Sequence, residues 1–119
     1  MRVYGAALVL LISLAGFGAL PARADVSPAE VAKAKELFDA GAREYEAGRF
    51  DLAIQAFEQA YKIAPRDGIT FSIAQAHRRE YTKKSSRANL VRAVLLYKEY
   101  VAKVKDGARV ADATRALGE

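Results

Sequence analysis

Cysteine and tryptophan are absent from the 119 residues of this chain, and histidine occurs once, as His77. Without cysteine the chain has no disulfide, no thiolate nucleophile, no cysteine-bound metal and no cysteine that could carry a lipid. A metal site or an acid–base pair would need partners for the single imidazole at helical spacing. The neighbouring residues Thr70, Ser72, Arg78 and Arg79 supply no such partner. We therefore predict no metal and no cofactor, and a packing or surface role for His77.

The usual patterns of catalytic and nucleotide-binding sites are missing as well. No serine lies in a Gly-x-Ser-x-Gly motif, and the glycines are dispersed rather than gathered into a phosphate-binding loop. Glu44 and Glu46 cannot face each other on a helix, because residues two apart point to different sides. A small hydrolase is the enzymatic alternative, but no reactive constellation supports it. We predict that the chain is not an enzyme.

Charged residues are also missing from Val3 to Ala22. Arg2 precedes this apolar run, and Ala22-x-Ala24 follows it with the small-residue pattern of a cleavage site. We interpret residues 1–24 as a secretory signal peptide and expect a periplasmic or secreted protein. The alternative is an uncleaved N-terminal anchor, for which the apolar run is barely long enough.

Positive charge is concentrated in the second half of the chain. Cleavage after residue 24 removes Arg2 and Arg23, which lowers the net charge from +5 to +3. Residues 25–67 carry a net charge of −3, and residues 68–119 carry +6. Export separates the chain from chromosomal DNA and cytoplasmic RNA, so we do not expect a nucleic-acid partner in spite of the basic half.

Helical periodicity runs through the sequence after residue 27, and no segment alternates apolar and polar residues as a strand does. The run Ser27–Glu30 has the pattern of a capping box at the start of a helix, and Gly48 is placed to end that helix. Pro65 ends the second helix, and Asp67 is placed to cap the third. We predict an all-α fold with helices near residues 28–47, 51–64, 68–81, 87–105 and 108–117.

The stretch Leu37–Pro65 has the pattern of two helices that pack against each other as a hairpin. Small residues recur where the two helices must approach closely, and large apolar residues recur around them at helical spacing. The small residues are Ala40, Gly41, Ala53, Ala56 and Ala60, and the large ones are Leu37, Phe38, Tyr45, Phe50, Ile54, Phe57 and Ile63. Stacks of such hairpins present extended binding surfaces, which favours a binding scaffold.

Residues 34–67 resemble one tetratricopeptide repeat, a helix–turn–helix unit of about 34 residues. The spacing Ala53-x3-Phe57 with the closing Pro65 is the clearest part of the resemblance. Leu37 stands where the family often has tryptophan, and Glu44 where it often has tyrosine. The other matching residues are Ala40, Gly41, Tyr45, Gly48, Phe50 and Ala60. The resemblance implies a short right-handed solenoid of antiparallel hairpins, with about five helices within residues 25–119.

Residues 68–107 resemble a second, degenerate repeat, and an expected capping helix follows at residues 108–117. The residues that carry this resemblance are Phe71, Ala74, Gln75, Ala76, Ala93 and Tyr97. Ala53 and Ala93 are 40 residues apart rather than about 34. We assign the excess to a basic loop insertion at Tyr81–Arg87, since loops tolerate insertions. The segments FSIAQAHRRE and YKEYV also resemble the short exported tetratricopeptide proteins of Gram-negative bacteria.

In this family the first helix of each hairpin lines a concave groove that binds a partner peptide or helix. The resemblance therefore implies a non-catalytic interaction or assembly module of the bacterial cell envelope. Phe38 and Ala42 stand where some members hold a C-terminal carboxylate with lysine and asparagine, so we do not expect that clamp. Exposure of Phe38 and Tyr45 would favour an apolar or extended peptide, whereas Phe38 in the core is the alternative. Carried over by position, the groove residues are Lys35, Phe38, Ala42, Tyr45, Glu46, Ile69, Ser72, Ala76, Arg79 and Glu80.

A basic patch surrounds the expected loop and consists of Arg78, Arg79, Lys83, Lys84 and Arg87. It is explained either by a charged, solvated loop or by docking on an anionic partner. That partner is an acidic protein segment, a membrane surface or an envelope polymer. A structural component that self-associates is a further alternative. Two hairpins and one helix are fewer than the three repeats that stable arrays usually need, so we expect a homo-oligomer or completion by a partner.

Overall fold

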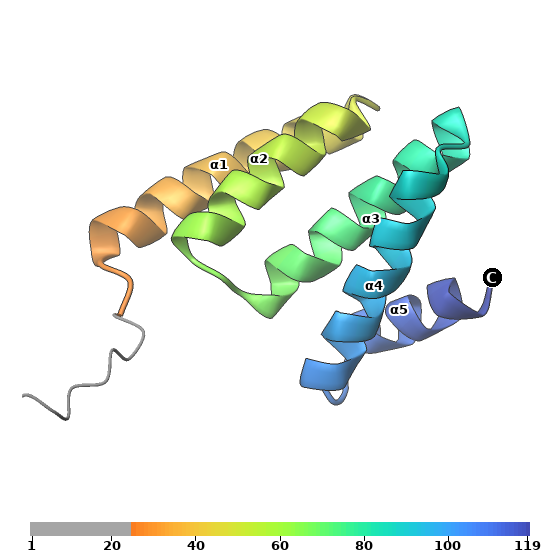
Figure 1. Cartoon of the computed structure of the whole chain (residues 1–119). Helices are drawn as coiled ribbons and strands as arrows, with labels where there is room; N and C mark the ends of the chain where they lie inside the picture. The colour runs from red at the N-terminus through yellow and green to blue at the C-terminus, as the bar shows by residue number, and fades with distance from the viewer. Residues whose placement is uncertain (1–24) are drawn as a thin grey trace, which may run out of the picture.

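The computed structural model describes residues 25–119, and the expected signal peptide lies outside them. These residues form five helices and no strand, so the predicted all-α fold is confirmed (Figure 1). Within them, no helix has the length and apolar character required to cross a membrane. The helices are α1 (Pro28–Glu46), α2 (Phe50–Ile63), α3 (Asp67–Lys84), α4 (Arg87–Lys103) and α5 (Ala108–Gly118).

The first hairpin begins and turns where its local signals indicate. The Ser27 hydroxyl accepts a hydrogen bond from the Glu30 backbone N–H, and the Glu30 carboxylate accepts one from the Ser27 N–H at 2.9 Å. These bonds hold the pKa of Glu30 below its ordinary value. Gly48 has a φ of +80° in the turn between α1 and α2, a conformation that glycine adopts without steric cost.

The second hairpin differs from the prediction at both ends of α3. Asp67 is the first residue of α3 rather than its cap, and Arg66 stands at the cap position without a side-chain hydrogen bond. The helix continues to Lys84, so the expected loop insertion at residues 81–87 is wrong: only Ser85 and Ser86 connect α3 to α4. Ser85 takes the left-handed conformation with φ +55°, which ends the helix without a glycine. The excess residues of this hairpin therefore lengthen its helices.

Small residues form the contacts between the helices of the core. Ala53, Ala60, Ala74, Ala76 and Ala113 are completely buried. They bring the helix backbones close together, and aromatic rings fill the space between them. The ring centroids of Phe38 and Phe57 are 5.0 Å apart in the first hairpin, and those of Phe71 and Tyr100 are 5.2 Å apart in the second.

Each hairpin is antiparallel, and its two helices pack chiefly on each other, while α2 joins the hairpins by packing on α3 (Figure 1). The helices α1, α3 and α5 run in the same direction. Early residues of α1 and α3 line one hollow, later residues of both helices line a second, and Tyr45 meets Arg79 beyond them. Arg109 at the start of α5 contacts Gly68 at the start of α3, and Glu119 after α5 pairs with Arg78. The first helices of the hairpins, α1 and α3, thus run parallel to each other and to α5, and the second helices, α2 and α4, run in the opposite direction.

Candidate functional site

The main candidate site is a hollow of about 410 Å³ at the N-terminal ends of α1, α3 and α5. Its floor is apolar, and three cationic side chains stand among the lining residues. No acidic residue among residues 25–119 lines it. The lining residues, together called the α1–α3 groove, are Val31, Ala34, Lys35, Phe38, Ala64, Arg66, Gly68, Ile69 and Arg109.

The cations of this groove differ in how they are held. Lys35 pairs with Asp39 at 3.1 Å, one turn along α1. The guanidinium of Arg109 lies 5.6 Å from the centre of the Phe71 ring, and one of its nitrogens is 3.0 Å from where a Cβ on Gly68 would stand. Glycine at position 68 therefore leaves the room in which Arg109 lies across α3. Arg66 has no ion pair within residues 25–119 and is exposed.

A smaller hollow of about 140 Å³ continues the groove toward the C-terminal end of α1. Phe38 lines both hollows and is half-buried against Phe57, so it belongs partly to the core and partly to the surface. The second hollow is lined by Phe38, Ala42, Tyr45, Glu46, Phe57, Ser72 and Gln75. Together the two hollows bring seven of the ten expected groove residues to one seam between α1 and α3.

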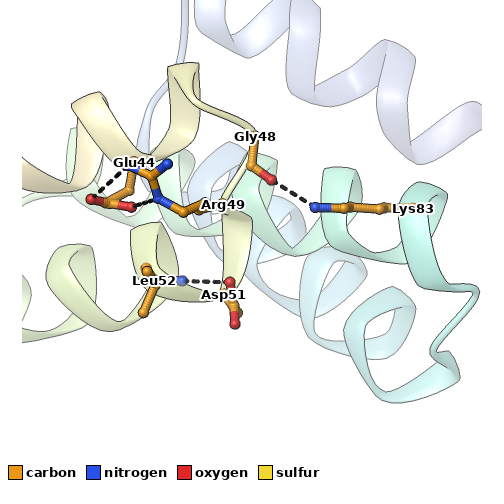
Figure 2. A network of polar contacts seen from close by, with 6 residues as sticks. All are labelled: Glu44, Gly48, Arg49, Asp51, Leu52 and Lys83. Atoms are coloured by element: carbon orange, nitrogen blue, oxygen red, sulfur yellow. Dashed lines mark hydrogen bonds and ion pairs between the residues drawn. The ribbon is translucent and has the colours of Figure 1, made fainter.

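The seam ends at a set of contacts that join the two hairpins. The Arg79 guanidinium lies 4.9 Å from the centre of the Phe50 ring and 5.6 Å from that of Tyr45. Figure 2 shows the Lys83 ammonium of α3 reaching the carbonyl oxygen of Gly48 in the α1–α2 turn, at 2.9 Å. Arg79, an expected groove residue, thus closes the seam by covering two aromatic rings.

The same turn holds an ion pair of its own. Arg49 and Glu44 bind each other through two hydrogen bonds across the turn, with Nη2 and Oε1 3.3 Å apart (Figure 2). The hydrogen bond from Arg49 lowers the pKa of Glu44, and the same bond raises the pKa of Arg49. Asp51 accepts a hydrogen bond from the Leu52 N–H at 3.0 Å. The charged groups of this turn are engaged in structure rather than aimed at a ligand.

Two expected groove residues do not face the groove. Ala76 is completely buried in the core, and Glu80 is 4% exposed. One oxygen of Glu80 lies 3.6 Å from the Lys84 ammonium, while the other has no hydrogen-bond partner. Both positions are groove residues only by the family resemblance, carried over by position. Because α3 packs on α2 and α4 as well as facing α1, most of its circumference is covered.

The basic patch is dispersed over helices instead of gathered on a loop, and four of its five cations have contacts. Arg78 pairs with Glu119, Arg79 stacks on aromatic rings, Lys83 binds a backbone carbonyl, and Lys84 pairs with Glu80. Only Arg87 has none of these contacts within residues 25–119. The basic patch therefore lies at the end of α3 and the start of α4, and not on an inserted loop.

His77 packs between α3 and α4. It is 9% exposed, and its Nδ1 donates a hydrogen bond to the Asn89 side-chain oxygen at 2.7 Å. The described part of the chain contains no group of three or more histidine, cysteine or acidic side chains that could hold a metal ion. The imidazole thus connects the two helices of the second hairpin, which is the packing role proposed for it.

Sequence reasoning missed part of the α1–α3 groove. Val31 and Ala34 precede the expected positions on α1 by one turn, and the periodicity of that helix was a signal for them. Ala64 and Arg66 come from the connection between α2 and α3, and Arg109 comes from α5. No pattern in the sequence indicates these three, because their approach depends on how separate helices pack.

Comparison with known proteins gives no relative for this chain. No family model, no curated protein and no solved structure matches it.

Proposed function

We propose that this chain is a non-catalytic interaction module of the tetratricopeptide type, which binds a partner peptide in the α1–α3 groove. The observation that carries the proposal is the lining of the larger hollow, where an apolar floor meets three cations and no acid. Ligand sites of this kind combine an apolar surface with a few placed charges.

The order of the helices supports the repeat part of the proposal. The helices α1, α3 and α5 run parallel, and α2 and α4 return between them, as stacked helix–turn–helix units require. In such a stack the first helices share one face. The groove lies on the face shared by α1, α3 and α5, where a peptide can contact all of them.

The lining indicates which ligands the groove favours. Val31, Phe38 and Ile69 offer an apolar surface to a side chain, and burial of that side chain supplies most of the affinity. Arg66 and Arg109 stand beside this surface and favour a carboxylate next to the apolar residue. The proposed ligand is therefore an extended or helical peptide segment with an apolar side chain adjacent to an acidic one.

The place of action in this proposal is the bacterial cell envelope. Its support is the sequence pattern of residues 1–24, with Arg2, the uncharged run and the Ala22-x-Ala24 site. Cell fractionation with an antibody against residues 25–119 tests it: recovery from the periplasm or medium is expected, and recovery only from the cytoplasm contradicts it.

A peptide-display selection against the full chain, followed by affinity measurement on the selected peptides, tests the groove. We expect peptides with paired apolar and acidic residues. The double variant Arg66→Glu with Arg109→Glu should weaken their binding by about tenfold or more, since attraction becomes repulsion.

The matched control is Lys62→Glu with Lys105→Glu, which makes the same change in net charge at exposed positions outside the groove. This control should bind the selected peptides within about twofold of the original chain at ordinary ionic strength, where distant charges are screened. Equal loss in both double variants would mean that net charge, and not the groove, controls binding.

A further inference from the structure

The outer face of α4 carries an apolar surface that no described part of the chain covers. Leu90 is 38% exposed, Val91 47% and Leu95 52%, and Val94 lies half-buried between them. These residues follow the apolar spacing of the helix, yet its buried contacts are made by other positions, namely Ala93, Leu96, Tyr97 and Tyr100. We call Leu90, Val91, Val94 and Leu95 the α4 apolar face.

This face is hollowed rather than flat. A hollow of about 450 Å³ lies along it, and the end of α3 contributes Tyr81 to the lining. Ser85 and Arg87, on either side of the α3–α4 turn, complete the lining. Apolar side chains of a partner can therefore insert here, which gives more buried contact than a flat surface of the same area.

The arrangement of the face fits a helix as its occupant. The four residues stand at positions i, i+1, i+4 and i+5, so they form a stripe along two turns of α4. The backbone groups of α4 are bonded within the helix and offer no edge for strand pairing. A second helix can lay its own apolar stripe along this one.

The charge around the face indicates the polar side of that helix. Residues 78–98 contain seven lysine and arginine residues and one acid, Glu80, which is buried. Four of these cations, Arg78, Arg79, Lys83 and Lys84, have the contacts described above. Arg87 lines the hollow, and Lys98 lies one turn beyond Val94 and Leu95. Neither has an ion pair within residues 25–119. The α4 apolar face is thus flanked by available positive charge.

A second copy of this chain does not offer the complementary helix. The helix α1 carries five acids and three cations, but its large apolar side chains Leu37, Phe38 and Tyr45 already pack on the core. A copy docking through α1 would therefore bring no free apolar stripe to the α4 apolar face.

We propose that the α4 apolar face is a docking site for an amphipathic helix with an acidic polar side, supplied by a different protein. This surface is separate from the α1–α3 groove and shares no lining residue with it. The chain then has two binding surfaces, one for a peptide along the first helices and one for a helix against α4.

The test uses three synthetic peptides of about 18 residues, or five helical turns. They share one apolar stripe of leucine and carry glutamate, glutamine or lysine on the polar side. Fluorescence anisotropy with the full chain should give the tightest binding for the glutamate peptide. Tighter or equal binding of the lysine peptide, or no measurable binding of the glutamate peptide, overturns the proposal.

The variant Leu95→Glu should lower the affinity for the glutamate peptide by about tenfold or more, because it removes an apolar contact and adds repulsion between two carboxylates. Leu52→Glu on α2 is the matched control, since Leu52 is 41% exposed and lies outside this hollow. The affinity of this control for the glutamate peptide should stay within about twofold of that of the original chain. Circular dichroism of both variants checks that the helices persist, and equal effects of the two changes overturn the assignment to α4.

Two further measurements identify other occupants. Sedimentation of the full chain with vesicles of phosphatidylglycerol tests a membrane surface, and sedimentation velocity of the chain alone tests a second copy. Association in either experiment that Leu95→Glu abolishes and Leu52→Glu preserves would assign the face to that occupant and overturn the proposal. Absence of both, together with glutamate-peptide binding, supports it.

Discussion

At the scale of single residues, Gly41 shows most clearly how the first hairpin depends on close packing. A Cβ at this position would stand 2.6 Å from Cδ1 of Phe57, which is buried in the core and packed on Phe38. That distance is shorter than carbon atoms tolerate, so the ring or the helix must move. The absence of a side chain at position 41 therefore sets the distance between α1 and α2.

Gly41→Ala should lower the free energy of unfolding by about 1–3 kcal/mol, as overpacked cores do. The sign of this change is informative, because replacing glycine by alanine in a helix interior otherwise raises the free energy of unfolding by about 0.5–1 kcal/mol. Urea unfolding followed by circular dichroism measures the change. Gly118→Ala is the control, since nothing lies within 4 Å of its added Cβ, and it should stay within about 0.5 kcal/mol of the original chain. A gain in stability at position 41 would contradict the packing described for this hairpin.

At the scale of helices, the start of α1 is controlled by the reciprocal bonds of Ser27 and Glu30. Ser27→Ala should lower the free energy of unfolding by about 0.5–2 kcal/mol, because the Glu30 N–H loses its side-chain acceptor. Urea unfolding measures this change. Ser86 precedes α4 without any side-chain cap bond, so Ser86→Ala is the matched control and should have the smaller effect.

The same contact makes α1 sensitive to acid. The pKa of Glu30 is lowered from its ordinary value of 4.5, so its contribution is present above pH 4.5 and is lost as the pH falls through the folded-state pKa. We expect stability to decrease on acidification below pH 4.5 and to decrease less in Glu30→Gln, which keeps an acceptor but does not titrate. Unfolding curves at neutral and acid pH measure the two slopes. Equal slopes would show that Glu30 does not couple to folding.

Helix boundaries show what the sequence predicts well and what it does not. The ends of the first hairpin follow from residues that act locally, namely the Ser27–Glu30 capping pattern, Gly48 and Pro65. The end of α3 depends on a left-handed serine at position 85, which no propensity indicates. The family resemblance likewise predicts Lys35 and Phe38 on the groove, whereas Arg109 reaches it only because α5, which packs on α4, begins close to the start of α3.

At the scale of the whole molecule, the helices do not share the core equally. Eight residues of α3 are buried, against one residue, Ala113, of α5. In a stack where each element contacts only its neighbours, the terminal element opens with the lowest free energy. We therefore expect amide hydrogen exchange to be slowest in α3 and fast in α5.

Ala113→Glu tests this order, because it places a charge at the only buried position of α5. Exchange in α5 should accelerate, while the amides of α1 and α2 keep their protection, as hydrogen-exchange mass spectrometry would show. Thr114→Glu is the control, since Thr114 is the exposed neighbour of Ala113. Equal acceleration in all five helices would mean that residues 25–119 unfold as one cooperative unit.

The contact of Lys83 with the Gly48 carbonyl links the two hairpins by charge. Together with Arg79 over Phe50, it lies beside the packing of α2 on α3, which joins the same hairpins without charge. Both cations are exposed, so dissolved ions compete with these two contacts. High salt should therefore weaken this link and leave the packing of α2 on α3 to hold the hairpins together.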